Sequence, residues 1–289
     1  MFAIIGIVIV LVMVFGGYLG SGGTMGIILK ALPFEMVMIG GAALGGFILG
    51  NDITTIKATG RDVARVFKGA RWSPSDYRDL LCLLFELLWL ARQNPVALEE
   101  HVESPESSAI ITRYPRIAAD HEVIELICDT LRVASMNYND PHQVEEVLDK
   151  RLEVRKNHAL HTSHAIQIVA DALPALGIVA AVLGIIKTMG AIDEPPSILG
   201  AMIGGALTGT FLGVFLAYCF VGPIASRMRM IVEEDDHFYQ LIREVLVANL
   251  HAHPANICIE VGRQNTPHSN RPEFNDIDSA MREIKKNAA

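Results

Sequence analysis

The sequence has no basic tract and few charged residues. Only 19% of its 289 residues are charged, and acidic residues outnumber basic ones to give a formal net charge of −8. Because nucleic acids are bound through clusters of Lys and Arg that neutralise phosphates, this composition argues against a nucleic-acid partner. In contrast, 51% of the residues are hydrophobic and the mean hydropathy is positive. These values indicate a membrane protein with a substantial soluble part.

Motifs of enzymatic chemistry are missing as well. The sequence contains no phosphate-binding loop, no G-x-G-x-x-G, no nucleophile elbow and no H-E-x-x-H. The four cysteines are widely spaced without a C-x-x-C pair, which argues against disulfides and a zinc site. His158, His161 and His164 could place ligands on one side of a helix, but no Cys or carboxylate follows at matching spacing, so we interpret them as solvated surface. His251 and His253 are weaker metal candidates still, and we expect no enzyme, metal or cofactor.

Charge is also absent from four long apolar runs. Residues 198–226 contain no Asp, Glu, Lys or Arg, and residues 172–186 are uncharged too. At about 1.5 Å per residue, helices of this kind can cross a hydrocarbon layer of about 30 Å. Two further runs lie near the N-terminus. We therefore predict four transmembrane helices at roughly 1–20, 34–51, 166–188 and 198–223, with Glu35 at the edge of the second.

The orientation of these spans follows from the Lys and Arg residues near their ends. The connections after the first and third spans carry only Lys30 and Lys187. The long middle segment and the C-terminal tail carry the other basic residues near the spans: Lys57, Arg61, Arg65, Lys68, Lys150, Arg151, Arg155, Lys156, Arg227 and Arg229. We predict that both termini are cytoplasmic. The N-terminal run lacks a basic region and an A-x-A site, so we interpret it as a retained span.

Helical patterns dominate the soluble segments. Residues 75–92 are dense in Leu and follow Ser73 and Pro74, which are typical of a helix start, and Asn94-Pro95 ends this helix. A further helical pattern begins at Pro105 and continues over 115–136, others cover 142–164, 227–250 and 276–286, and no β-sheet is predicted. The fold class is an all-α membrane protein with four domains: transmembrane helices 1 and 2 (1–51), a large cytoplasmic helical domain (52–165), transmembrane helices 3 and 4 (166–223) and a cytoplasmic helical tail (224–289).

Small residues form stripes along the last two spans. Gly177 and Ala181, with Gly184 nearby, form a short stripe in the third. In the fourth, small residues recur at every fourth position: Ala201, Gly205, Gly209, Gly213 and Ala217. Helix association in a membrane relies on close packing, so these stripes predict tight helix contacts. Packing within the chain and an interface with another subunit are both compatible with the pattern.

Three other residues of these spans bear on mechanism. Pro174 removes a backbone hydrogen bond early in the third span and predicts a kink or hinge, while Pro223 closes the fourth span. Asp171 lies near the membrane boundary, where a carboxylate needs a partner or water. Thr210 either bonds back to its own helix or lines an ion path. A proton-driving chain needs an acid near mid-membrane, and since we find none in the four spans, we predict that a partner supplies it.

Several runs of the sequence resemble one family. FGGYLGSGGT, RYPRIAAD, DALPALGIVAAVLGIIKTMG, GALTGTFLGVFLAYCFVGPIA and IEVGRQ are similar to the flagellar motor stator subunits (MotA) of the MotA/TolQ/ExbB superfamily, over nearly the whole chain. The resemblance implies a pentamer of this subunit around a dimer of MotB, whose membrane aspartate carries the ion, in the bacterial inner membrane. Ion flow would turn the pentamer, and the 52–165 domain would push the rotor protein FliG.

The resemblance also implies roles for individual residues. Pro174 and Pro223 match the prolines that couple ion passage to conformation, and Thr210 matches a pore threonine facing the partner's aspartate. Ala181 stands where sodium-driven relatives tend to have a threonine, and since alanine cannot coordinate sodium, protons are the expected ion. Asp171 completes the ion-path set.

Rotor contact is assigned by the same resemblance to the 52–165 domain. Arg92 matches the cytoplasmic arginine, and Glu99 or Glu100 its companion acid. An ExbB/TolQ-like energiser of envelope transport is the alternative function. Such relatives have three spans, whereas four are predicted here.

Overall fold

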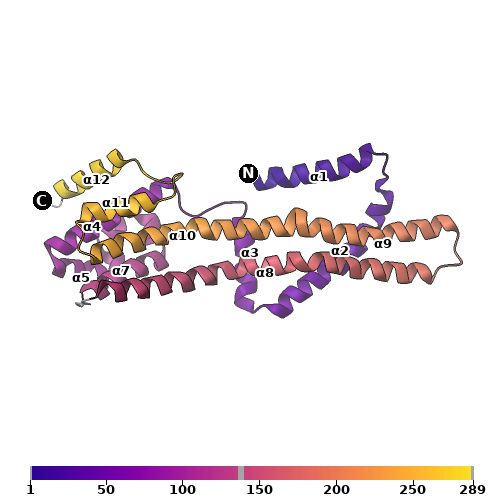
Figure 1. The fold of residues 1–289 in the computed structure, drawn as a ribbon, viewed down its shortest axis with the longest axis horizontal. Coiled ribbons are helices and arrows are strands. Elements are labelled where there is room, and N and C mark those ends of the chain that lie inside the picture. The colour runs from indigo at the N-terminus through magenta and orange to yellow at the C-terminus, as the bar shows by residue number, and fades with distance from the viewer. Residues whose placement is uncertain (1, 136–139, 288–289) are drawn as a thin grey trace. The chain divides into compact units, whose positions relative to one another are not determined.

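The computed structural model describes residues 2–135 and 140–287, and this part of the chain is entirely helical, without a β-strand (Figure 1). It divides into two compact units. One contains Met1–Gly69 and Ala159–Ile231, and the other contains Ala70–His158 and Val232–Ala289. The first unit holds the apolar helices, and the second holds a soluble helical core.

Among the described residues, four helices are long and apolar enough to span a membrane, as the sequence predicted. They are α1 (Phe2–Gly20), α2 (Met25–Gly50), the second half of α8 (Pro141–Met189) and α9 (Pro196–Leu216). Their large apolar side chains are mostly exposed in the single chain, as for Ile178 and Leu183. Such exposure is expected of helices whose solvent is lipid. The first residue of the predicted first span, Met1, lies outside the described residues.

The second span is longer than predicted. Lys30, which we placed in a connection, and Glu35, which we placed at the span's edge, both lie inside α2, as does Pro33. The actual connection is the short turn after Gly20, where Gly22 adopts φ +87°, a left-handed conformation that glycine tolerates best. The apolar residues on both sides of Pro33 continue the helix through it, so no helix starts after Pro33.

The third predicted span is not a separate helix, because α8 continues unbroken from the soluble unit through Pro174 to Met189.

The prediction that the fourth span ends at Pro223 is wrong, because the helix does not end there. The backbone continues helically from α9 through a π-helical turn, η3 (Ala217–Val221), into α10 (Gly222–Leu250). Within this turn the Gly222 N–H donates to the Ala217 carbonyl, five residues back. The extra residue widens the helix just before Pro223, where proline would otherwise clash with the preceding turn.

The soluble core is built around α4 (Pro74–Gln93), in agreement with the predicted buried helix. Ser73 and Asp76 form a capping box at its start, and Asn94 caps its end. The Leu side chains of α4 are almost completely buried, and Trp72 stacks on Phe238 with ring centroids 4.0 Å apart. The core is completed by the amino end of α8, the carboxyl end of α10 and four further helices: α5 (Pro95–Glu103), α7 (His121–Ser135), α11 (Ala255–Asn265) and α12 (Phe274–Asn287).

The remaining elements are short. α3 (Ile53–Arg65) follows α2, and its N-cap Asp52 accepts a hydrogen bond from the Thr55 N–H at 3.2 Å. Between α5 and α7 lie the 3-10 turns η1 (Pro105–Ser107) and η2 (Ile111–Arg113) and the single turn α6 (Pro115–Ala118). The continuous helix predicted over 115–136 is therefore interrupted, because Asp120 caps a new helix by accepting from the Val123 N–H. Met136, its predicted end, is not among the described residues.

Candidate ion path and rotor-facing residues

One close helix contact in the membrane unit joins α8 and α9, which lie side by side (Figure 1). A Cβ atom added to Gly213 would lie 2.6 Å from the Leu173 carbonyl oxygen and 2.8 Å from the Gly177 Cα. A Cβ added to Gly177 would lie 2.9 Å from the Gly209 carbonyl oxygen. The obstructing atoms are backbone atoms, which cannot rotate away. The two helices therefore touch backbone to backbone at Gly177 and Gly213.

The rest of the small-residue stripe has mixed surroundings. Ala217 is buried, and a Cβ on Gly205 would make only an ordinary contact of 3.8 Å with Ala31 of α2. Ala201, at the other end, is exposed. The Gly209–Ala217 half therefore packs within the chain, while the Ala201 end is open in the single subunit.

The predicted mechanistic residues surround this contact. Pro174 is half-buried one turn before Gly177, and Ala181 is buried one turn after it. Thr210 is half-buried next to Gly209 in α9. A hydrogen bond back to the helix, one of the two interpretations of Thr210, is seen at the neighbouring Thr208. The Thr208 Oγ1 donates to the Gly204 carbonyl oxygen at 3.0 Å. α8 and α9 thus carry Pro174, Ala181 and Thr210 close to one crossing.

Asp171 and Pro223 lie at other positions of the unit. Asp171 is exposed in the single chain and accepts a hydrogen bond from Gln167 Nε2 at 2.8 Å, so its carboxylate has a partner. Pro223 lines a cavity of about 770 Å³ together with Gly6 of α1 and Tyr218 of η3.

Glu35 is the membrane-unit residue that the sequence analysis missed. It is buried with 5% exposure, and its Oε2 has no hydrogen-bond partner within the described structure. The same oxygen would lie 2.6 Å from a Cβ on Gly209, so the carboxyl group reaches α9 at the small-residue stripe. A carboxyl group therefore lies within α2, and not at the edge of a span where the sequence placed it. Burial of an unpartnered carboxylate is costly, which marks Glu35 as a residue with a specific role.

Glu35 also borders a cavity of about 720 Å³ between α2, α8 and α9. Lys30 and Lys187 line this cavity, together with Gly205 and Ala206. The three charged groups are thus collected around one space. A sequence signal was available, since the run from Met25 onward remains apolar enough to be helical despite Lys30 and Glu35.

Arg92 lies in the soluble unit at the end of α4. Its guanidinium Nη2 donates to the His253 carbonyl and lies 3.5 Å from Asn249 Oδ1. It thereby holds the segment that follows α10, close to the carboxyl end of that helix, a favourable place for a positive charge. Glu99 and Glu100 are exposed on α5. Within the described residues neither acid is paired with Arg92, so the structure does not choose between them.

Four apolar helices with a backbone-tight helix pair, together with a separate core of buried helices, define a helical membrane protein with a soluble helical domain. Two family models match: Motility protein A N-terminal over residues 4–95, and the MotA/TolQ/ExbB proton channel family over residues 119–240. Motility protein A of Escherichia coli is 36% identical over 99% of this chain and 96% of its own. Chemotaxis protein LafT of Vibrio parahaemolyticus is 36% identical over 96% and 98%.

Solved structures share the fold. The C. jejuni MotAB structure has a TM-score of 0.72 at 18% identity, covering 94% of this chain and 98% of that chain. The flagellar MotAB stator complex from Bacillus subtilis has a TM-score of 0.68 at 18% identity, covering 96% and 98%. The chain belongs to the motility protein A family, the flagellar stator subunits within the MotA/TolQ/ExbB proton channels of the inner membrane. This is a channel family and not an enzyme family, and the ExbB/TolQ-like alternative is less well supported.

Proposed function

We propose that this chain forms a homopentamer around a MotB dimer in the inner membrane, with both termini in the cytoplasm. In this assembly the MotB membrane aspartate takes up the proton, and proton flow turns the pentamer against the rotor protein FliG. The proposal is supported by the names of the related structures, which are MotAB complexes. It is also supported by the identity of 36% to motility protein A over almost the whole chain.

The observation that carries the proposal is the backbone contact at Gly177 and Gly213. Pro174 lies within one turn of this contact on α8, and Thr210 lies within one turn of it on α9. No side chain separates the two backbones there. A change of backbone conformation at Pro174, where one helical hydrogen bond is missing, therefore has to move α9 as well. Such a rigid link suits a subunit that converts ion passage into movement.

The transported ion is proposed to be the proton. Ala181 is buried beside the crossing and offers no oxygen ligand, whereas sodium binding needs several. Thr210 supplies a hydroxyl, which suits a hydrogen-bonded proton path. Motor torque should follow pH and be insensitive to sodium. Torque that tracked external sodium at constant pH would contradict this ion assignment.

Complementation of a bacterium lacking its stator tests the whole proposal. The chain, expressed with its MotB partner, should restore swimming, and the two should co-purify. For the rotor contact, Arg92→Glu should reduce rotation strongly and Arg92→Gln should do so more weakly, since Gln keeps a donor for the His253 carbonyl without the charge. Arg78→Glu, at another exposed arginine of α4, is the matched control. Normal swimming of the Arg92→Glu strain would remove Arg92 from the rotor surface.

A further inference from the structure

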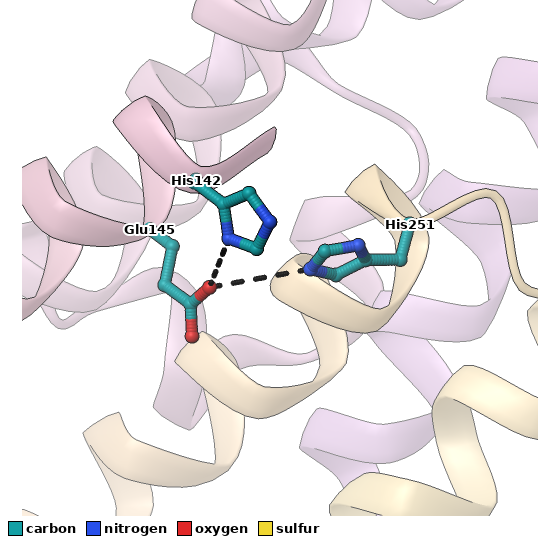
Figure 2. A group of neighbouring side chains, drawn as sticks. All are labelled: His142, Glu145 and His251. Atoms are coloured by element: carbon teal, nitrogen blue, oxygen red, sulfur yellow. Dashed lines mark ion pairs between the residues drawn. The ribbon is translucent and has the colours of Figure 1, made fainter. Parts of the chain in front are cut away.

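Two histidines and a glutamate converge on the surface of the soluble unit. His142 and Glu145 lie one turn apart at the start of α8, and His251 directly follows the end of α10 (Figure 2). His142 Nδ1 lies 3.7 Å, and His251 Nε2 4.0 Å, from the same oxygen, Glu145 Oε2. One ligand atom from each residue lies within 4.8 Å of the others, and no other such group of three occurs in the described part of the chain.

The Glu145 carboxylate is held in place by Arg243. Arg243 Nη2 donates to Glu145 Oε1 at 2.7 Å, so the second oxygen, Oε2, is directed to the two imidazoles. Arg243 is itself fixed by hydrogen bonds to Asp149 and Glu244, of which those to Asp149 contribute most to raising the pKa of Arg243. Support of this kind is what orients a metal-ligating carboxylate.

The local charge favours a cation. Three carboxylates, those of Glu145, Asp149 and Glu244, surround a single guanidinium. The amino end of α8 opposes this through its dipole, but Asp140 already accepts a hydrogen bond from the His142 N–H there. The surroundings therefore carry an excess of negative charge next to the two imidazole rings.

We propose that His142, Glu145 and His251 form a binding site for a divalent transition metal, with zinc as the best fit. Two imidazole nitrogens and one carboxylate oxygen are a typical three-ligand set for zinc, with water in the fourth position. Zinc–ligand bonds of about 2.0–2.1 Å place tetrahedral ligand atoms about 3.3 Å apart. The observed separations require a small closing movement, and His142, whose side chain is 79% exposed, has room to make it.

Binding would join the first turn of α8 to the segment after α10. That segment also carries the His253 carbonyl, which accepts from Arg92. The metal would therefore stiffen the support of Arg92, and this consequence, unlike the site itself, rests on the proposed function. The sequence could not reveal the site, because His251 is far from His142 and Glu145 along the chain.

Titration of the purified, metal-stripped full-length chain with Zn²⁺, followed by calorimetry, tests the site. Titration with Co²⁺, followed by its visible absorption, reports the coordination geometry. The wild-type chain should bind about one equivalent at this site. His142→Ala and His251→Ala should each lower the affinity by at least about 10-fold, the size expected for losing support or a ligand of a metal. Both side chains are exposed, so these variants should fold normally.

His121→Ala is the matched control. His121 Nδ1 lies 3.7 Å from Glu125 Oε2, the same separation as in the His142–Glu145 pair, but the described structure places no third ligand beside it. Its affinity for Zn²⁺ should equal that of the wild-type chain. Unchanged binding in both His142→Ala and His251→Ala, or an equal loss in His121→Ala, would overturn the proposal.

Discussion

Replacing Gly213 by alanine should disrupt the α8–α9 contact. The added Cβ would lie 2.6 Å from the Leu173 carbonyl oxygen, which is 0.8 Å below the 3.4 Å at which ordinary van der Waals contact begins. The Gly177 Cα and N are also too close, at 2.8 and 3.0 Å. Since every obstructing atom belongs to a backbone, the helices must separate by about that 0.8 Å along their crossing.

The expected cost combines two opposing effects. Overpacking of a tight contact costs about 1–3 kcal/mol. The gain in helix propensity from glycine to alanine is about 1 kcal/mol at most, and its value in lipid is smaller than in water because the backbone is already hydrogen-bonded. Overpacking wins, so Gly213→Ala should lower the thermal stability of the detergent-purified chain and abolish swimming in a complementation assay.

Gly205→Ala is the matched control on the same helix and the same stripe. Its Cβ would meet only the Ala31 Cβ at 3.8 Å, an ordinary contact. This variant should be as stable as the wild-type chain. If Gly213→Ala behaved like Gly205→Ala in both stability and swimming, then α8 and α9 do not pack backbone to backbone, and the reasoning fails.

Three further predictions concern buried or paired carboxyl groups. Glu35→Gln should retain proton flux in the assembled complex, because the carrying acid belongs to the partner; lost flux in an intact complex would make Glu35 part of the path. Glu86 is buried and accepts from Tyr114 Oη at 2.7 Å and from Arg113, so Glu86→Gln should lower stability by about 1–3 kcal/mol in thermal unfolding, whereas an unchanged midpoint would contradict this. Hydrogen bonds from Arg263 hold the pKa of Glu260 below its ordinary value, so its stabilisation is present above about pH 4.3 and is lost as the pH falls through the lower, folded-state pKa. Glu260→Gln should therefore cost under about 1 kcal/mol at pH 7, since the pair is partly exposed, and nothing in strong acid; a cost independent of pH would refute it.

The sequence predicted the spans and the soluble core because both depend on local patterns. An uncharged apolar run is sufficient to identify α1, and Ser73 with Pro74 is sufficient to start α4, since capping involves neighbours in the chain. The burial of the α4 leucines followed from apolar residues on more than one helix face.

The errors arose where a local signal has two physical outcomes. Pro223 normally ends a helix, but a π-helical turn before it absorbs the strain. The charge of Glu35 suggested the edge of a span. Instead Glu35 lies inside α2, where it packs against Gly209 of α9, a helix far away in the sequence. The predicted 142–164 helix and the third span form one helix, α8, because no helix breaker separates them; the change from an amphipathic to an apolar pattern marked a change of surroundings and not a helix end.

The candidate site was predictable only as a set of residues. Glycine spacing indicated close packing, but the pairing of Gly177 with Gly213 depends on the crossing of two helices. The hydrogen bond from Arg92 to the His253 carbonyl likewise joins segments that are distant in sequence. The roles of Pro174, Thr210 and Arg92 in ion coupling and rotor contact stay predictions.

Proton flux in reconstituted vesicles tests the central claim that a second polypeptide donates the titrating acid. Vesicles containing this chain alone should show no flux above empty vesicles when a pH gradient is imposed. Vesicles containing the chain with its MotB partner should conduct once the complex is in its open form, and changing the partner's membrane aspartate to asparagine should stop the flux. Proton flux through the chain alone, abolished by Glu35→Gln, would contradict the account.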